Sequence, residues 1–357
     1  DSPSLQVLIL LMTMVGFPFF ALSTTPPLIQ KMYSRRFSLG KPYRLYAVSN
    51  LGSFAALISY PFFVEQYLTR SSQSNCWALL FIFFVLLMMW ISYPDPSSDS
   101  TSADKNKTGS QTKPAIPVIS CVVWITLGAI PTANLLATSN LLTQEVASNP
   151  LLWIIPLSLY LLSFVICFES DRWYRRWLFF PGLLVSIFYS LPIYESGVEA
   201  DFWAQIVAFC SAGFFVSMCC HGELARLRPK TDRMTLFYLM ISLGGASGGM
   251  LVALIAPLIF DDFYEFHLSL IATIALCTLM VFKDFDHRPK GRNIRVLAHK
   301  ITPVLFGFIA VFTLIMATDS VIERWLANRS EHYVSVERNE YGVVKVINST
   351  RESSKNH

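Results

Sequence analysis

Charged residues are scarce in this sequence. Asp, Glu, Lys and Arg make up 15% of its 357 residues, whereas hydrophobic residues make up 53%. An ordinary soluble domain has about 25% charged residues, because its surface must be wetted by water. The composition therefore excludes a soluble globular protein. The net charge of +4 is small, and it gives no reason to expect a nucleic-acid partner.

The sequence also lacks the residue patterns of metal and catalytic sites. Its seven cysteines form no Cys-x-x-Cys pair, and six of them fall in or at the ends of long apolar segments. A free cysteine in such a segment behaves as a small apolar residue. The six histidines are scattered, and neither a Ser/His/Asp set nor a nucleotide fingerprint can be assembled. We therefore expect no metal, no cofactor and no enzyme active site in this chain.

Long apolar segments are what the sequence has in abundance. A helix needs about 20 apolar residues to cross the hydrocarbon core of a bilayer, and the backbone of a spanning segment must be hydrogen-bonded within that segment. The sequence therefore predicts an all-α polytopic membrane protein with the lipid bilayer as its main partner. We expect ten spans, at 6–27, 46–64, 76–93, 116–138, 150–168, 177–193, 202–220, 234–260, 264–282 and 301–318.

Basic residues alternate between successive connections. The odd-numbered connections together hold 21 Lys and Arg, whereas the even-numbered ones hold only Arg70. Because basic loops stay in the cytoplasm, this pattern predicts a multi-pass membrane protein whose basic connections face the cytoplasm. Asp1 and the tail after Ala317 should then lie outside the cytoplasm. The outer connections are acidic, with Glu195, Glu199, Asp201, Asp261, Asp262 and Glu265.

One connection divides the membrane part in two. Residues 94–115 are rich in Ser, Thr, Asp and Lys and have no apolar periodicity, which is typical of a flexible linker. We expect three spans in 1–93, a cytoplasmic linker at 94–115, seven spans in 116–318 and an external tail at 319–357. The sequence begins with Asp1 rather than Met and enters the first span almost at once, so we expect it to be a fragment.

The segment Cys220 to Pro229 concentrates reactive side chains after an apolar run. It contains His221, Glu223, Arg226 and Arg228. His221 and Glu223 are two residues apart and would point about 200° away from each other on a helix, so they do not form a metal motif. A cytoplasmic loop cluster is favoured, with Glu223 pairing with one of the arginines and the arginines contacting anionic headgroups. A catalytic role is the less favoured alternative.

The glycine-rich segment 242–250 does not resemble a phosphate loop. It lies within a span, and neither the preceding strand nor the Gly-Lys-Ser/Thr ending is present. Gly244 with Gly248, and Gly245 with Gly249, are instead spaced as two overlapping small-xxx-small pairs. Such pairs let another helix approach closely, so we expect helix packing here.

Polar residues accumulate in segment 131–150. Asn134, Thr138 and Glu145 share one helical face, and polar groups at membrane depth are functional candidates. This face would line a polar cleft open to the outside. The equally supported alternative is a helix that leaves the bilayer near Leu136 and lies in the interface.

The first span carries a Ser-Thr-Thr-Pro-Pro sequence at 23–27. Prolines free backbone carbonyls, and hydroxyl groups can satisfy the backbone again, so we expect a kink or a break. Broken helices line substrate sites in many transporters, although a proline pair near a basic loop more often ends a helix.

Several of these segments together resemble the membrane region of bacterial spermidine synthase-like proteins. They are GFPFFALSTTPPLIQKMYS (16–34), PYRLYAVSNLGSFAALISYPFFVE (42–65), LLWIIPLSLYLLSFVICF (151–168), HGELARLRP (221–229) and FYLMISLGGASGG (237–249). The resemblance implies a protein of the bacterial inner (cytoplasmic) membrane, with a multi-span region fused ahead of an aminopropyltransferase-like domain and further spans before the first one here. It also implies that VERNEYGVVKVI (336–347) is the strand that opens that domain.

Three hypotheses about function follow from these observations. The leading one is a non-catalytic membrane module of a spermidine synthase-like protein that anchors or serves an external domain, because the glycine-rich loop and acidic residues of a synthase are absent before His357. The second is a transporter for a small solute, with cations among the candidates. The third is an accessory subunit that packs against another membrane subunit through 244–249.

Overall fold

The computed structural model describes residues 3–36, 42–92, 116–146, 150–286, 294–329, 333–339 and 342–347. Within these residues, nine helices have the length and the apolar composition needed to cross a membrane. The predicted class, an all-α polytopic membrane protein, is therefore confirmed. The chain forms two compact units, one of residues 1–54 with 121–357 and the other of residues 55–120.

The described elements are mostly long helices, some of them continued or interrupted by one-turn π or 3-10 segments (η). In chain order they are α1 (Pro3–Leu11), η1 (Met12–Gly16), α2 (Phe17–Ser23), α3 (Thr25–Arg36), α4 (Tyr43–Ser59), η2 (Tyr60–Val64), α5 (Glu65–Tyr67), α6 (Arg70–Ser92), α8 (Val118–Asn140), η3 (Leu141–Val146), η4 (Pro150–Trp153), α9 (Ile154–Glu169), α10 (Arg176–Ser196), η5 (Gly197–Glu199), α11 (Phe202–Arg226), η6 (Thr231–Arg233), α12 (Met234–Met250), η7 (Leu251–Ile255), α13 (Ala256–Ile259), α14 (Tyr264–Asp286), α15 (Ile294–Asn328), β1 (Tyr333–Asn339) and β2 (Gly342–Ile347).

The predicted spans overlap these helices, but several helices are longer than predicted, among them α3, which continues to Arg36, and α6, which begins at Arg70. The seventh span continues to Arg226 in α11 rather than ending at residue 220. The tenth, expected at 301–318, lies inside the 35-residue helix α15. The predicted linker at 94–115 lies outside the described residues.

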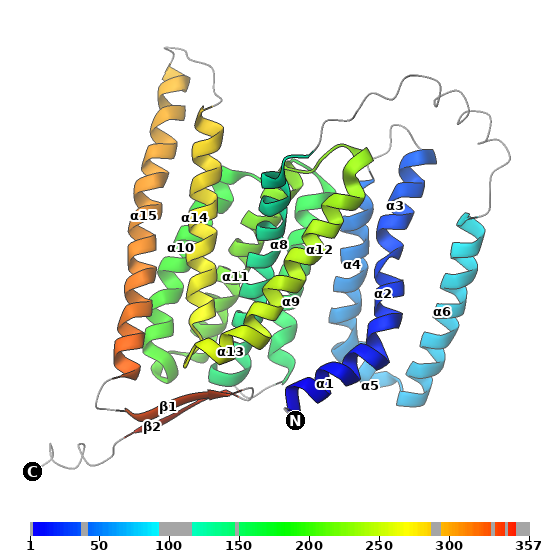
Figure 1. Ribbon diagram of the computed structural model, residues 1–357, viewed down its shortest axis with the longest axis horizontal. Coiled ribbons are helices and arrows are strands. Elements are labelled where there is room, and N and C mark those ends of the chain that lie inside the picture. Colours follow the sequence, from blue (N-terminus) through cyan, green and yellow to red (C-terminus); the bar gives the residue numbers. More distant parts are fainter. Residues whose placement is uncertain are drawn as a thin grey trace, which may run out of the picture. The chain divides into compact units, whose positions relative to one another are not determined.

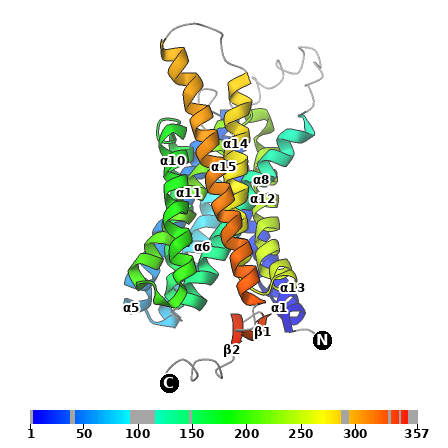
Figure 2. The same cartoon turned by 90° about the vertical axis from the view of Figure 1, so that its left-hand side faces the viewer.

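Helix α11 is the centre of the larger unit. It packs against α9, α10 and α14, and α15 packs against α10 and α14; Figures 1 and 2 both show α14 and α15 side by side. Of the apolar stretch of α11, 56% is buried within the protein, the highest share of any span. Many apolar side chains on the other helices are exposed, and a bilayer would cover them.

Glycines set the distance between α8 and α12. A Cβ atom on Gly244 would lie 2.2 Å from the carbonyl oxygen of Ile125, and one on Gly248 would lie 2.2 Å from that of Ala129. Gly245 and Gly249 have only ordinary contacts, at 3.5 Å and 3.8 Å. One of the two small-xxx-small pairs thus packs against a helix of the same chain.

The first span is interrupted where its prolines predict it. Helix α2 ends at Ser23, Thr24 forms a turn, and α3 begins at Thr25. The hydroxyl of Ser23 donates to the carbonyl of Phe20 at 2.9 Å, and that of Thr24 donates to the carbonyl of Ala21 at 2.8 Å. Both hydroxyls therefore bond carbonyls of the turn before the interruption.

The smaller unit is built from the end of α4, η2, α5 and α6. The chain turns between α5 and α6, where Leu68 is extended. Gln73 of α6 donates its side-chain amide to the carbonyl of Leu68 at 2.9 Å, and the hydroxyls of Thr69 and Ser72 bond each other at 2.9 Å. These bonds satisfy backbone and side-chain groups at the start of α6.

The tail contains an antiparallel hairpin. Strand β1 pairs with β2 in a register that places Glu337 opposite Val344 and Arg338 opposite Val343. The prediction of a single strand over 336–347 is therefore wrong, because the chain reverses between Asn339 and Gly342. Figure 1 shows the hairpin beyond the end of α15 at which the chain leaves the bundle.

Candidate functional site

Glu223 is buried at the end of α11 that leads into a basic connection. Its carboxylate accepts two bonds from Arg176, at 2.6 Å and 2.5 Å, and one from the hydroxyl of Tyr174 at 2.9 Å. Arg226 lies 3.5 Å from the same carboxylate, so of the two arginines considered as partners of Glu223 in the sequence, this one is in contact. We call Tyr174, Arg176, Glu223 and Arg226 the Glu223 cluster.

Tyr174 and Gly222 shape this cluster together. A Cβ atom on Gly222 would lie 2.3 Å from the ring of Tyr174, so only glycine lets the ring rest on α11. Burial raises the pKa of Tyr174 well above its usual value, and the charge of Glu223 adds to this effect. The hydroxyl therefore stays protonated and donates a hydrogen bond to Glu223.

His221 points into the protein rather than toward the Glu223 cluster. Its ring stacks on Phe164 at 3.6 Å between centroids, and Nδ1 lies 2.7 Å from the hydroxyl oxygen of Ser163. Ser163 already donates to the carbonyl of Tyr160 at 2.6 Å. Nδ1 must therefore be protonated and donate a hydrogen bond to the hydroxyl oxygen of Ser163, which leaves Nε2 as an acceptor. Among the described residues this buried Nε2 has no hydrogen-bond partner.

The prediction that 221–228 forms a solvated loop needs correction. His221 and Glu223 lie inside α11 and are fully buried, while Arg226 is the last residue of the helix. The reason is tertiary: Tyr174 of the preceding connection and Arg176 of α10 satisfy a carboxylate that would otherwise need water. Arg228 pairs not with Glu223 but with Asp171, at 2.9 Å and 3.0 Å.

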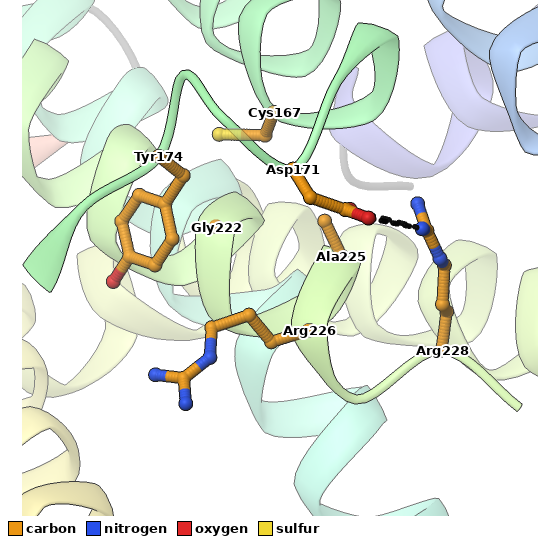
Figure 3. A pocket seen from close by; sticks show the side chains of 7 residues that line it. All are labelled: Cys167, Asp171, Tyr174, Gly222, Ala225, Arg226 and Arg228. Atoms are coloured by element: carbon orange, nitrogen blue, oxygen red, sulfur yellow. Dashed lines mark hydrogen bonds and ion pairs between the residues drawn. The ribbon is translucent and has the colours of Figure 1, made fainter.

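A pocket of about 410 Å³ opens beside these residues, between the ends of α9 and α11. Figure 3 shows Asp171 pointing at Arg228, and the arginines Arg226 and Arg228 on either side of Ala225. Cys167, Tyr174 and Gly222 complete its lining. The pocket is therefore lined by two guanidinium groups and one paired carboxylate.

Asn134 and Thr138 lie together in the interior of the larger unit. The side-chain amide nitrogen of Asn134 donates to the hydroxyl of Ser269 at 2.7 Å. The carbonyl oxygen of Asn134 and the hydroxyl of Thr138 are buried and lack partners among the described residues. Both border a cavity of about 10 Å³ next to Gly213, which is the space one water molecule occupies.

Segment 131–150 was interpreted either as the lining of a polar cleft or as a helix that leaves the bilayer near Leu136, and the structure gives its path. Helix α8 runs unbroken through Leu136 to Asn140 and continues as the π-helical turn η3. Asn134 and Thr138 are enclosed by α9, α11 and α14. The backbone of Glu145 belongs to η3, but its side chain lies outside the described residues.

A second ionic cluster joins the hairpin to the bundle. Asp262, between α13 and α14, is fully buried. It accepts bonds from Arg324 at 2.7 Å, Lys345 at 2.8 Å and Asn328 at 3.0 Å. Burial alone would raise the pKa of Asp262, but the hydrogen bond and charge of Arg324, together with the charge of Lys345, hold it below its ordinary value.

Arg338 of β1 makes the most buried contact of this cluster. Its guanidinium binds both carboxylate oxygens of Glu265, at 3.0 Å and 2.6 Å, and donates to the carbonyl of Asp262 at 2.6 Å. The side chains of Arg338 and Glu265 are only 3% and 6% exposed. We call Asp262, Glu265, Arg324, Arg338 and Lys345 the hairpin cluster.

Sequence reasoning missed the hairpin cluster. Asp262 and Glu265 were expected only as acidic residues of an outer connection. The signal that was available is complementary charge, because the tail contains Arg338 and Lys345 on the side of the membrane where those carboxylates were predicted. Charge alone, however, does not show which carboxylates a tail contacts.

Comparisons with known proteins add no further assignment. No protein-family model, curated protein or solved structure matches this chain. Within the part of the chain that the structure describes, no group of three or more His, Cys, Asp or Glu side chains is arranged to hold a metal ion.

Proposed function

We propose that this chain is a non-catalytic membrane module that anchors, or serves, a domain outside the bilayer, in the arrangement of the spermidine synthase-like proteins that its sequence resembles. The observation that carries this proposal is the hairpin cluster. A two-stranded hairpin is at most marginally stable by itself, but here Arg338 and Lys345 hold it against buried carboxylates of the helix bundle.

The two faces of the hairpin are suited to different partners. The side chains of Arg338 and Lys345 lie on one face, where they contact carboxylates of the bundle. On the other face Glu337 is exposed, and Val344 and Val346 are 58% and 46% exposed. An extramembrane domain that continues from this hairpin would cover those valines. The alternation of basic connections supports an orientation with the hairpin outside the cytoplasm.

Replacing Arg338 tests the anchor. In Arg338→Met, Glu265 stays buried without its bidentate partner, which costs about 3–5 kcal/mol. We expect the undocked hairpin to become at least about 100-fold more populated, and trypsin to cleave the solubilised chain after Lys345 correspondingly faster.

Glu337→Gln is the matched control, because Glu337 belongs to the same strand but is exposed on the other face. It should leave the cleavage rate unchanged. Equal cleavage rates for wild type and Arg338→Met would remove the support for the anchor. Trypsin added to spheroplasts, which reaches only the outer surface, tests the orientation.

A transporter for a small solute is the second candidate, supported by the buried polar groups around Asn134. Polar atoms at membrane depth are costly unless they contact water or solute, and the carbonyl oxygen of Asn134 and the hydroxyl of Thr138 face a cavity. The cavity, at about 10 Å³, is too small for a solute, so transport would require a second conformation in which it is wider.

Uptake measurements test the transporter. Asn134→Leu should abolish uptake of labelled spermidine into vesicles while leaving the protein inserted. Ser139→Ala is the control, because the hydroxyl of Ser139 donates only to its own helix, to the carbonyl of Leu135 at 2.8 Å. Uptake that is absent in wild type, or unchanged in Asn134→Leu, would rule out this second function.

A further inference from the structure

Asn134 presents its carbonyl oxygen, and not its amide nitrogen, to the cavity that it borders. The hydroxyl of Ser269 donates its only hydrogen to the carbonyl of Phe266 at 2.6 Å, so it must accept the 2.7 Å bond that joins it to Asn134. The amide nitrogen of Asn134 therefore faces Ser269, which fixes the orientation of the side chain. Its buried carbonyl oxygen has no partner among the described residues, and it can act only as an acceptor.

The hydroxyl of Thr138 differs from other threonine hydroxyls of the same helix. Thr126 and Thr132 of α8 each donate to the carbonyl four residues earlier, at 2.9 Å and 3.0 Å, which is a common bond for a threonine inside a helix. The hydroxyl of Thr138 is buried and has no partner among the described residues. It is therefore available both to donate and to accept a hydrogen bond.

Gly213 of α11 leaves space beside both of these oxygens. A Cβ atom on Gly213 would lie 3.2 Å from Oδ1 of Asn134 and 3.5 Å from Oγ1 of Thr138. The two oxygens therefore converge on one point of α11, and the cavity of about 10 Å³ that all three residues line lies there. This volume is close to the smallest that holds a water molecule.

We propose that this cavity binds one water molecule, which donates a hydrogen bond to the carbonyl oxygen of Asn134 and shares a second bond with the hydroxyl of Thr138. Buried polar groups are costly without a partner, and water is retained where at least two such groups meet in a space of its size. Among the described residues that line the cavity none carries a charge, so a bound cation would be buried without a carboxylate. The site shares no residue with the hairpin cluster, and it does not depend on the proposed anchor.

Thr138→Val gives opposite results with and without the bound water, because valine has nearly the shape of threonine but lacks the hydroxyl. If the hydroxyl bonds the water, its loss should raise the unfolding equilibrium constant of the purified full chain about tenfold. If the hydroxyl had no partner, the same change would remove a buried unpaired group and lower that constant. Thr126→Val, which loses only a bond within its own helix, is the matched control and should change the constant little. An unchanged or lower constant in Thr138→Val would overturn the proposal.

Gly213→Ala fills the space of the water and leaves both oxygens without a partner. We expect it to raise the unfolding equilibrium constant about tenfold or more, whereas Gly52→Ala, which adds the same carbon where no atom lies within 4 Å, should not raise it. On top of Thr138→Val, Gly213→Ala should add little, because the bridge is already broken. Fully additive losses would contradict a shared water, and Thr138→Val decides the matter alone if Gly213→Ala does not fold.

A density map that resolves ordered water tests the site directly. We expect a peak within hydrogen-bond distance of both Asn134 and Thr138 in the wild type, and none in Gly213→Ala. Replacing the sodium of the buffer by choline should leave the melting temperature unchanged. Absence of the peak would overturn the proposal, and so would a sodium-dependent rise of the melting temperature that Thr138→Val abolishes, since it would assign the cavity to a cation.

Discussion

Single residues decide whether a charge can be buried in this membrane protein. Glu223 has a side chain that is 2% exposed, and its two oxygens accept from Tyr174, Arg176 and Arg226. A buried charge without such partners would cost several kcal/mol. Gly222 is part of the same arrangement, because its lack of a side chain lets the ring of Tyr174 approach α11.

Glu223→Gln should therefore destabilise the protein. The amide places a donor opposite Arg176 and leaves that arginine without its carboxylate. We expect a loss of about 3 kcal/mol, the lower end for a broken buried pair, because Arg176 is 18% exposed and water can reach it. Unfolding in detergent by denaturant measures this loss. Glu199→Gln, at an exposed position outside the bundle, should change little, and an equal loss in both variants would contradict this account.

At the scale of helices, close approach of backbones holds α8 against α12. Gly244 and Gly248 lie against carbonyl oxygens of α8, whereas Gly245 and Gly249 lie beside side chains at ordinary distances. Two pairs that look equivalent in the sequence therefore have different surroundings. The accessory-subunit hypothesis relied on this segment, and Gly244 with Gly248 is already used within the chain.

Alanine substitutions separate the two glycine pairs. Gly244→Ala should destabilise the protein by about 1–3 kcal/mol, because the added carbon would overlap the carbonyl oxygen of Ile125. Gly249→Ala meets only Leu136 at 3.8 Å, and it should be neutral or stabilising by up to about 1 kcal/mol, since alanine favours a helix. Thermal unfolding of both variants gives the comparison. Matching melting temperatures would show that α8 and α12 do not pack in this way.

For the molecule as a whole, the hairpin cluster connects the extramembrane tail to the bundle and should respond to acid. The pKa of Asp262 is lower in the folded protein than in the unfolded chain, where it is close to 3.8. Its ionic contacts therefore stabilise the docked state fully above about pH 4. That contribution is lost as the pH falls from about 4 through the lower pKa of the docked state.

A spin label at position 344 measures this response. Val344→Cys places it on the exposed face of the hairpin, with the exposed Cys76 replaced by Ser. We expect the label to stay immobilised at pH 5 and to become mobile only well below pH 4. In the Asp262→Asn variant, the label at position 344 should be mobile, or nearly so, at every pH. A mobility transition between pH 5 and pH 7 in wild type would indicate a different titrating group.

The element order of this protein was predictable because each membrane span must satisfy its own backbone. Apolar length alone located nine helices, although some run past their predicted limits: α3 continues nine residues beyond residue 27, α6 begins six residues before residue 76, and α11 continues six residues beyond residue 220. The candidate sites were only partly predictable. Local spacing offered Arg226 or Arg228 as the partner of Glu223, and only Arg226 contacts it, at 3.5 Å. Arg176 and Tyr174 approach Glu223 from residues 47 and 49 positions away, and no local pattern contains that information.

The sequence by itself determined the all-α class, the approximate positions of the apolar helices, the interruption at Thr24 and the absence of a recognisable metal or nucleotide motif. These depend on composition, local hydrogen bonding and spacing along one helix. Only the tertiary structure decided which carboxylates are buried, which glycines touch a backbone and where the hairpin docks. Each of those outcomes depends on pairs of residues far apart in the chain, such as Arg338 with Glu265, whose meeting is set by how the helices pack.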